Sequence, residues 1–129
     1  MPSIKLSLYQ KEYEEVYMYK FNYISNYGKK SGLGACHAFE LPLVFKDKEF
    51  IFSKMIYGEE PKEDVERISN EMHETWKNFI IFGKPDRDKW PKFNGVDSII
   101  RIFDKETETK SLDRSKLMEV WKDMRFYEN

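Results

Sequence analysis

Two histidines and one cysteine are the first candidates for catalysis at neutral pH in this 129-residue chain. His37 lies in a glycine-containing segment between Gly34 and Pro42 and is flanked by small residues. A histidine in such a loop can present its ring to a cavity and act as a general base. From this position alone, a hydrogen-bonded structural histidine is the simpler interpretation, and catalysis needs support from the neighbouring residues.

The other candidates indicate structure rather than chemistry. Cys36 is adjacent to His37, and adjacent side chains in an extended loop point apart, so an inert, partly buried thiol is favoured over a nucleophile. His73 falls on the polar face of a predicted helix, which indicates a solvated surface histidine. These three residues lack the paired-ligand spacing of a zinc site, and no phosphate-binding glycine motif is present. We therefore expect no metal and no cofactor.

Hydrophobic spacing predicts the elements that must position His37. Residues 16–23 alternate as a strand whose two faces are both largely apolar, and residues 98–104 form a second short strand. Residues 61–82 and 111–127 have the spacing of amphipathic helices. The apolar stripe of the first helix consists of Val65, Ile68, Met72, Trp76 and Phe79. The first fifteen residues are a short helix or a frayed end, and the stretch between residue 23 and Pro42 is mostly loop. This order is an α/β pattern, although two short strands make a poor sheet.

The composition excludes several classes of protein. Lys and Arg number 22 and Asp and Glu number 23, which leaves no basic excess to hold a nucleic acid backbone. The apolar runs are far shorter than the roughly 20 residues that span a bilayer, and the first residues do not resemble a secretion signal. A single cysteine fits a reducing compartment. We expect one segment over residues 1–129 that acts in the cytoplasm, with no membrane and no nucleic acid as a partner.

Residues 34–45 (GACHAFELPLVF) resemble the catalytic-histidine block of type-B carboxylesterases, the family of para-nitrobenzyl esterases and cholinesterases. That block has a glycine, two further residues, the catalytic histidine and an acidic residue three positions later. Other segments resemble the family in the same order: the strand at 16–23, WKNF at 76–79, the Gly-x-Pro at 83–85, the Trp-Pro-x-aromatic step at 90–93, IFD at 102–104 and the closing helix around Trp121. The resemblance covers nearly the whole chain. It implies the C-terminal part of an α/β-hydrolase fold with an incomplete sheet.

The resemblance implies roles for two residues. His37 corresponds to the base of a catalytic triad, which takes the serine proton during attack on an ester carbonyl and later protonates the leaving alcohol and activates water. Glu40 matches the acidic position after the histidine, which is not the triad acid, so we expect it to support the loop. The implied substrate is a small-molecule carboxylic ester.

Some positions differ from the family. Leu43 stands where phenylalanine is usual, and Lys46 stands where glycine is usual, so we expect a different path of the chain beyond it. Residues 50–57 either line an acyl or alcohol pocket or pack in the core.

Two members of the triad are missing from the sequence. No serine is flanked by glycines two residues away on both sides, so the Gly-x-Ser-x-Gly nucleophile turn is absent. The triad of α/β-hydrolases runs serine, acid, histidine along the chain, so a segment that begins just before the histidine would hold one member. Because triad members act as a unit, the chain alone should be nearly inactive. Its first strand should also expose an unpaired edge, which predicts self-association or an N-terminal partner chain.

Three interpretations remain open. The chain is a C-terminal fragment that contributes His37 to ester hydrolysis when joined to the N-terminal part, or a non-catalytic interaction module that retains the hydrolase scaffold. The third, a small independent hydrolase that pairs Cys36 or a serine with His37, would need an acid and an oxyanion hole from a very small fold.

Overall fold

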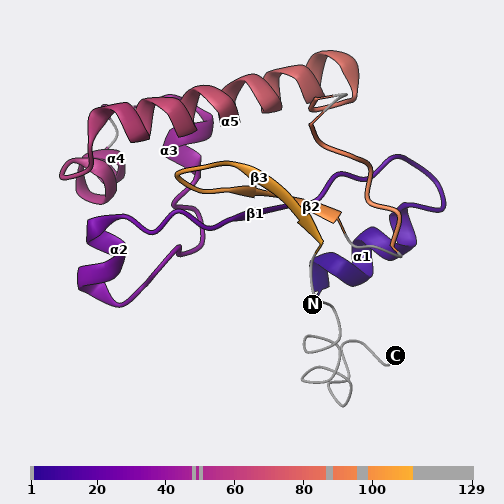
Figure 1. Cartoon of the computed structure of the whole chain (residues 1–129), viewed down its shortest axis with the longest axis horizontal. Coiled ribbons are helices and arrows are strands. Elements are labelled where there is room, and N and C mark those ends of the chain that lie inside the picture. The colour runs from indigo at the N-terminus through magenta and orange to yellow at the C-terminus, as the bar shows by residue number, and fades with distance from the viewer. Residues whose placement is uncertain (1, 48, 50, 87–88, 96–98, 112–129) are drawn as a thin grey trace.

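The computed structural model describes residues 2–47, 49, 51–86, 89–95 and 99–111. Its elements are α1 (Pro2–Gln10), β1 (Tyr19–Phe21), α2 (Asn26–Ser31), α3 (Leu41–Val44), α4 (Ile51–Tyr57), α5 (Lys62–Phe82), β2 (Ile99–Phe103) and β3 (Glu108–Ser111). The long helix α5 lies along the small sheet, with α2 and α4 beyond one end of the sheet and α1 beyond the other (Figure 1). None of the helices described is both long enough and apolar enough to cross a membrane.

The sheet has three strands in the order β1-β2-β3. β1 pairs in parallel with β2, with Tyr19 opposite Arg101, and β2 pairs antiparallel with β3, with Ile99 opposite Ser111. Because Ser111 belongs to a strand, the predicted start of the helix 111–127 is wrong, and the rest of that helix lies outside the described residues. Within the described part of the chain, β1 has no strand on its other edge. The sheet is thus small and incomplete, in agreement with the sequence.

β1 is shorter than the strand predicted over residues 16–23. Its pairing with β2 ends in two backbone hydrogen bonds, one on each side of β1. The N–H of Arg101 donates to the carbonyl of Met18 (3.0 Å), and the N–H of Asn22 donates to the carbonyl of Phe103 (2.8 Å). Tyr23, directly after them, is 2% exposed and belongs to the core. The apolar alternation therefore continues beyond the three residues that have a partner strand.

The stretch after β1 contains two short helices, α2 and α3, which the sequence does not predict. Ser25 caps α2, because its Oγ accepts the N–H of Gly28 (3.1 Å). The N–H of Gly34 donates to the carbonyl of Gly28 (3.0 Å), and a Cβ at position 28 would lie 2.4 Å from the carbonyl oxygen of Gly34. Glycine at position 28 therefore lets the chain return closely towards His37.

Helix α5 ends where the sequence predicts and begins one residue later than predicted. It follows Pro61 and ends at Gly83, whose φ of 68° is left-handed and whose N–H donates to the carbonyl of Phe79 (2.8 Å). In the predicted stripe, Ile68 and Met72 are fully buried, whereas Phe79 is 47% exposed. The stripe is correct over most of the helix, and its last position lies at the surface.

A group of aromatic rings joins α5 to the sheet. The ring centroids of Tyr19 and Trp76 are 4.9 Å apart, and Phe103 lies 5.9 Å from Trp76 and 5.8 Å from Trp90. Phe103 is fully buried, so this group connects β1, β2, α5 and the segment after α5. The contacts of Tyr19 with Trp76 and of Phe103 with Trp90 are edge-to-face, and such contacts add about 0.5–1.5 kcal/mol each to the burial of the rings.

Replacing Met72 with alanine should lower the free energy of unfolding by about 2–5 kcal/mol, because the side chain is fully buried and leaves a cavity. Ile81→Ala on the same helix is the control, since Ile81 is 60% exposed. Urea unfolding followed by tryptophan fluorescence measures both. Equal losses in the two variants would contradict the placement of the buried face of α5.

Candidate active site

His37 lies at the apex of a tight turn between α2 and α3. The N–H of Phe39 donates to the carbonyl of Cys36 (3.2 Å), so His37 and Ala38 are the two central residues of the turn. Ala38 has a φ of 68°, the left-handed value that a type II turn has at this position and that costs a non-glycine residue about 1–2 kcal/mol. The His37 side chain is exposed. Backbone strain beside a titratable side chain is typical of functional sites.

A buried hydrogen bond from α4 stabilises this turn. The Tyr57 hydroxyl of α4 donates to the carbonyl of Phe39 (2.7 Å), and both side chains are buried. Burial raises the pKa of Tyr57 above its ordinary value, so the hydroxyl stays protonated and remains a donor well into the alkaline range. The N–H of Leu41 then donates to the carbonyl of Ala38 (3.2 Å), which carries the turn into α3. Tyr57 is a positioning residue that sequence reasoning missed, since its partner is distant in the chain.

Two side chains of α5 bind the carbonyl groups at the end of α3. The Ser69 hydroxyl donates to the carbonyl of Leu43 (2.8 Å), and Nδ1 of His73 lies 2.9 Å from the carbonyl oxygen of Val44. The last carbonyl groups of a helix have no partner within it, so these side chains satisfy them. His73 is therefore half-buried and structural. The prediction of a solvated surface histidine is wrong because α3 packs on that side of α5.

The end of α3 turns at Lys46, which has a φ of 54°. The N–H of Lys46 donates to the carbonyl of Leu43 (3.3 Å), and that of Asp47 donates to the carbonyl of Pro42 (3.0 Å). These two bonds form a Schellman motif, in which the left-handed position favours glycine. Lys46 thus adopts a left-handed conformation, which costs a non-glycine residue about 1–2 kcal/mol.

His37 lines two hollows. The larger, of about 620 Å³, lies among the turn, α2, α3 and α4. Its apolar lining includes Tyr27, Leu33, Leu41, Phe45, Phe52 and Met55. The second, of about 400 Å³, lies among the turn, β1 and α1 and also contains Glu40 and Ser7. Phe52 and Met55 of α4 therefore line a hollow beside His37, whereas Tyr57 packs in the core, so α4 has residues that fit each of the two interpretations of residues 50–57.

Glu40 lies beside His37 in the second hollow and connects the turn to β1. Its carboxylate accepts a hydrogen bond from the Tyr19 hydroxyl (3.4 Å). Burial and the nearby charge of Glu40 raise the pKa of Tyr19 to about 12. Although Glu40 precedes α3, its side chain does not cap that helix. This arrangement is compatible with the predicted role of supporting the loop.

Cys36 lies beside His37 in the second hollow. Its thiol is free and half-buried, as the sequence suggests. Among the residues that the structure describes, no three His, Cys, Asp or Glu side chains are grouped so that they could hold a metal ion.

Replacing Ala38 tests the geometry of the turn. Ala38→Gly should keep or raise the free energy of unfolding, by up to about 1 kcal/mol, because glycine adopts a positive φ without strain. Ala38→Val should lower it by about 1–3 kcal/mol, since a β-branched residue is an outlier in this conformation. Thermal unfolding of both variants measures the difference. A valine variant as stable as the glycine variant would contradict a left-handed residue 38.

The Tyr19–Glu40 contact predicts a dependence of stability on alkaline pH. The hydroxyl titrates at about 12 in the folded chain and near the ordinary value of 10.0 in the unfolded chain, so its contribution is complete below pH 10 and is lost as the pH rises to 12. Glu40→Gln should lower the pKa of Tyr19, because the negative charge disappears. Tyrosinate absorbance, compared with the same titration of Tyr19→Phe, isolates this group. An unchanged titration in Glu40→Gln would contradict the contact.

Comparisons with known proteins agree with the resemblance. A model of the carboxylesterase family matches residues 1–121. A phenmedipham hydrolase of Pseudarthrobacter oxydans is 28% identical over 91 residues, which are 68% of this chain and 18% of that protein. The structure is similar to a PNB esterase, with a TM-score of 0.78 and 23% identity over 97% of this chain and 25% of the esterase. It is also similar to a carboxylesterase of Geobacillus stearothermophilus, with a TM-score of 0.66 and 27% identity over 83% of this chain and 22% of the other.

The chain thus spans a quarter or less of the length of these relatives. Its sheet and helices have the fold of one part of the α/β-hydrolase domain of carboxylesterases. Since the family model matches all but the last eight residues, the chain belongs to the carboxylesterase family.

Proposed function

We propose that this chain is the C-terminal part of a carboxylesterase and supplies the general base, His37, for the hydrolysis of carboxylic esters. The observation that carries this proposal is the exposed His37 on a strained turn beside an apolar hollow, in a chain of this family. The serine nucleophile and the triad acid come from upstream sequence. Because the chain contains a single cysteine, we place it in a reducing compartment such as the cytoplasm.

The proposed mechanism uses the imidazole of His37 as a proton carrier. The ring takes the proton of the serine hydroxyl as the serine oxygen bonds to the ester carbonyl carbon, and it gives that proton to the leaving alcohol when the C–O bond breaks. It then takes a proton from water, which attacks the acyl-enzyme, and returns it to the serine. Glu40 stabilises the loop through its contact with Tyr19 of β1, and it takes no proton in this scheme.

The apolar hollow beside His37 suggests which part of the ester it holds. Its volume of about 620 Å³ and its lining from α2, α3 and α4 suit an apolar acyl or alcohol group. Phe52 and Met55 are 51% and 44% exposed, so their side chains remain available to a ligand. The proposed substrates are therefore small carboxylic esters in which the acyl group or the alcohol group is apolar.

A second candidate function is that of a non-catalytic interaction module on the same scaffold. The observation that favours it is the exposed apolar surface at the end of α5, where Ile80 and Phe82 are 78% and 66% exposed. Such a module would bind its partner equally well without the His37 imidazole.

Hydrolysis of p-nitrophenyl acetate and butyrate tests the proposal. The purified chain should be nearly inactive alone and active when mixed with an upstream PNB esterase segment that carries the serine and the acid. His37→Ala should lower the rate of the mixture by about a thousandfold or more, because triad members act as a unit.

Cys36→Ser is the control for this experiment, since a serine esterase does not need the adjacent thiol. Loss of activity in that variant would indicate a thiol nucleophile instead. A mixture that forms a complex but remains inactive would reject the catalytic proposal in favour of the interaction module.

A further inference from the structure

The hollow beside His37 is lined by side chains from different helices. α2 contributes Tyr27, and α4 contributes Phe52 and Met55. These two short helices contact one another at the same end of the structure (Figure 1). The space that is open to a ligand therefore depends on how α2 lies relative to α4.

Glu60 connects the start of α2 to the end of α4. Its N–H donates to the carbonyl of Tyr57, the last residue of α4 (3.0 Å). Its carboxylate accepts the N–H of Asn26, the first residue of α2, and the hydroxyl of Tyr23 (2.5 Å). Hydrogen bonds to a carboxylate are roughly twice as strong as those between neutral groups. One side chain thus fixes α2 against the end of α4.

Tyr23 orients the carboxylate of Glu60 from within the core. Its side chain is 2% exposed, and its ring stacks on that of Tyr57 with the centroids 6.2 Å apart. Burial and the hydrogen bond to Glu60 raise the pKa of Tyr23, so the hydroxyl stays protonated and remains a donor. The position of the Glu60 carboxylate is therefore set by a core residue rather than by solvent.

The neighbouring Glu59 makes a different kind of contact with α2. Its carboxylate forms an ion pair with Lys30 (2.5 Å), and both side chains are 69% exposed. An exposed ion pair of this kind contributes little to stability. Glu59 is therefore a matched control for Glu60, because it also bonds to α2 but does so at the surface.

We propose that Glu60 is a positioning residue that holds α2 against α4 and thereby determines which apolar groups the hollow beside His37 admits. This inference rests on the proposed function, because that function takes the hollow to hold the apolar part of the ester. It adds a residue that controls the shape of the site although it does not line it.

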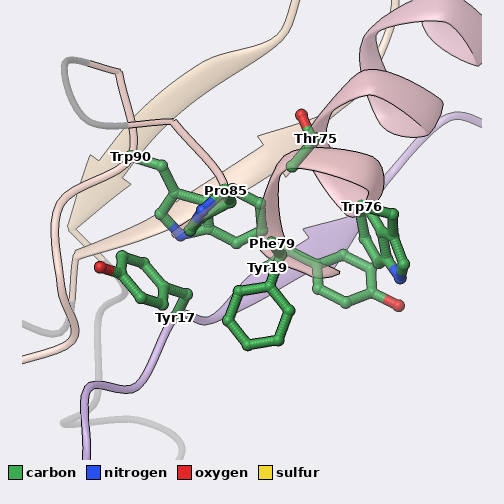
Figure 2. A pocket seen from close by; sticks show the side chains of 7 residues that line it. All are labelled: Tyr17, Tyr19, Thr75, Trp76, Phe79, Pro85 and Trp90. Atoms are coloured by element: carbon green, nitrogen blue, oxygen red, sulfur yellow. The ribbon is translucent and has the colours of Figure 1, made fainter. Parts of the chain in front are cut away.

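Another apolar hollow, of about 150 Å³, serves as a reference. It lies between β1, α5 and the segment that follows α5 (Figure 2). Its lining includes Tyr17, Trp76, Phe79 and Trp90, and none of its described lining residues belongs to α2 or α4. A ligand bound in this hollow should not respond to the position of α2.

Binding of hexan-1-ol to the full chain tests the proposal without reference to catalysis. The readout is the methyl signal of Met55 in NMR spectra, and the signal of the fully buried Met72 is the internal reference. Glu60→Ala should weaken binding by about tenfold or more, because the donors of Asn26 and Tyr23 lose their acceptor and α2 shifts. Glu60→Gln should restore the affinity to within about threefold, since its amide oxygen still accepts.

Two controls accompany these variants. Glu59→Ala removes only the exposed ion pair and should leave the affinity unchanged. Phe79→Ala alters the other hollow and should leave the Met55 response unchanged. Unchanged binding in Glu60→Ala, or equal weakening in Glu59→Ala and Glu60→Ala, would overturn the proposal. A lower melting temperature of Glu60→Ala with unchanged hexanol binding would also overturn it, because the role of Glu60 would then be structural only.

A second pair of variants decides the matter if Glu60→Ala does not fold. Asn26→Pro removes the N–H that Glu60 accepts, and proline is tolerated at the first position of a helix. Ser25 already has the extended conformation that precedes proline, with a φ of −66° and a ψ of 165°. Asn26→Ala keeps this N–H. The proline variant should bind hexanol about tenfold more weakly than the alanine variant, and equal affinities would contradict the proposal.

Kinetics of the mixture with the upstream esterase segment separate this inference from the proposed function. Glu60→Ala should raise the KM for p-nitrophenyl butyrate by about tenfold and change kcat by less than about twofold, because the histidine turn is held by Tyr57 rather than by α2. A lower kcat with an unchanged KM would overturn the inference. Hexanol binding with the expected pattern in a chain whose mixture is inactive would reject the proposed function alone. An active mixture of a chain whose Met55 signal does not respond to hexanol would reject this inference alone.

Discussion

The packing of the Phe103 ring holds the layers of this structure together. β1 and β2 share only three residue pairs, which is too short a ladder to fix a sheet against a helix. Phe103 fixes the sheet against the helix instead, because its ring is fully buried and contacts the rings of Tyr19, Trp76 and Trp90. The sheet, α5 and the segment after α5 therefore share one aromatic core. Loss of that core would separate the strand that precedes His37 from the helix that supports α3.

The histidine turn depends on a second kind of constraint, in which side chains from regular helices bind main-chain carbonyl groups. Tyr57 binds the carbonyl of Phe39, and Ser69 binds that of Leu43. A buried carbonyl left without a donor costs about 1–3 kcal/mol, so the bond from Tyr57 strongly favours one path of the main chain at Phe39. Ser69 is a second donor to the Leu43 carbonyl, which also accepts the N–H of Lys46. Catalytic groups must be held within a fraction of an ångström, and support from helices achieves this better than support from loops.

The sequence predicts the elements whose signal is local. Helix α5 follows from its apolar spacing and from Gly83, and β2 from its apolar run. β3 does not follow, because its residues are polar and its strand conformation depends on pairing with β2. The left-handed Ala38 does not follow either, since alanine has no preference for that conformation and the surrounding bonds impose it. The prediction that His37 is a catalytic base comes from the resemblance of its neighbours, whereas its position beside two hollows depends on α4 and β1.

The support of His37 and the open edge of β1 lie on different parts of the chain. The bonds that hold the turn come from α4 and α5, and neither Tyr57 nor Ser69 lines the hollow between Tyr17, Trp76 and Trp90. Tyr19 connects the two parts, because its ring contacts that of Phe103 and its hydroxyl binds Glu40 beside His37. A shift of the Tyr19 ring would move its hydroxyl and thereby the carboxylate of Glu40, so the packing around Phe103 acts on the histidine loop through this contact.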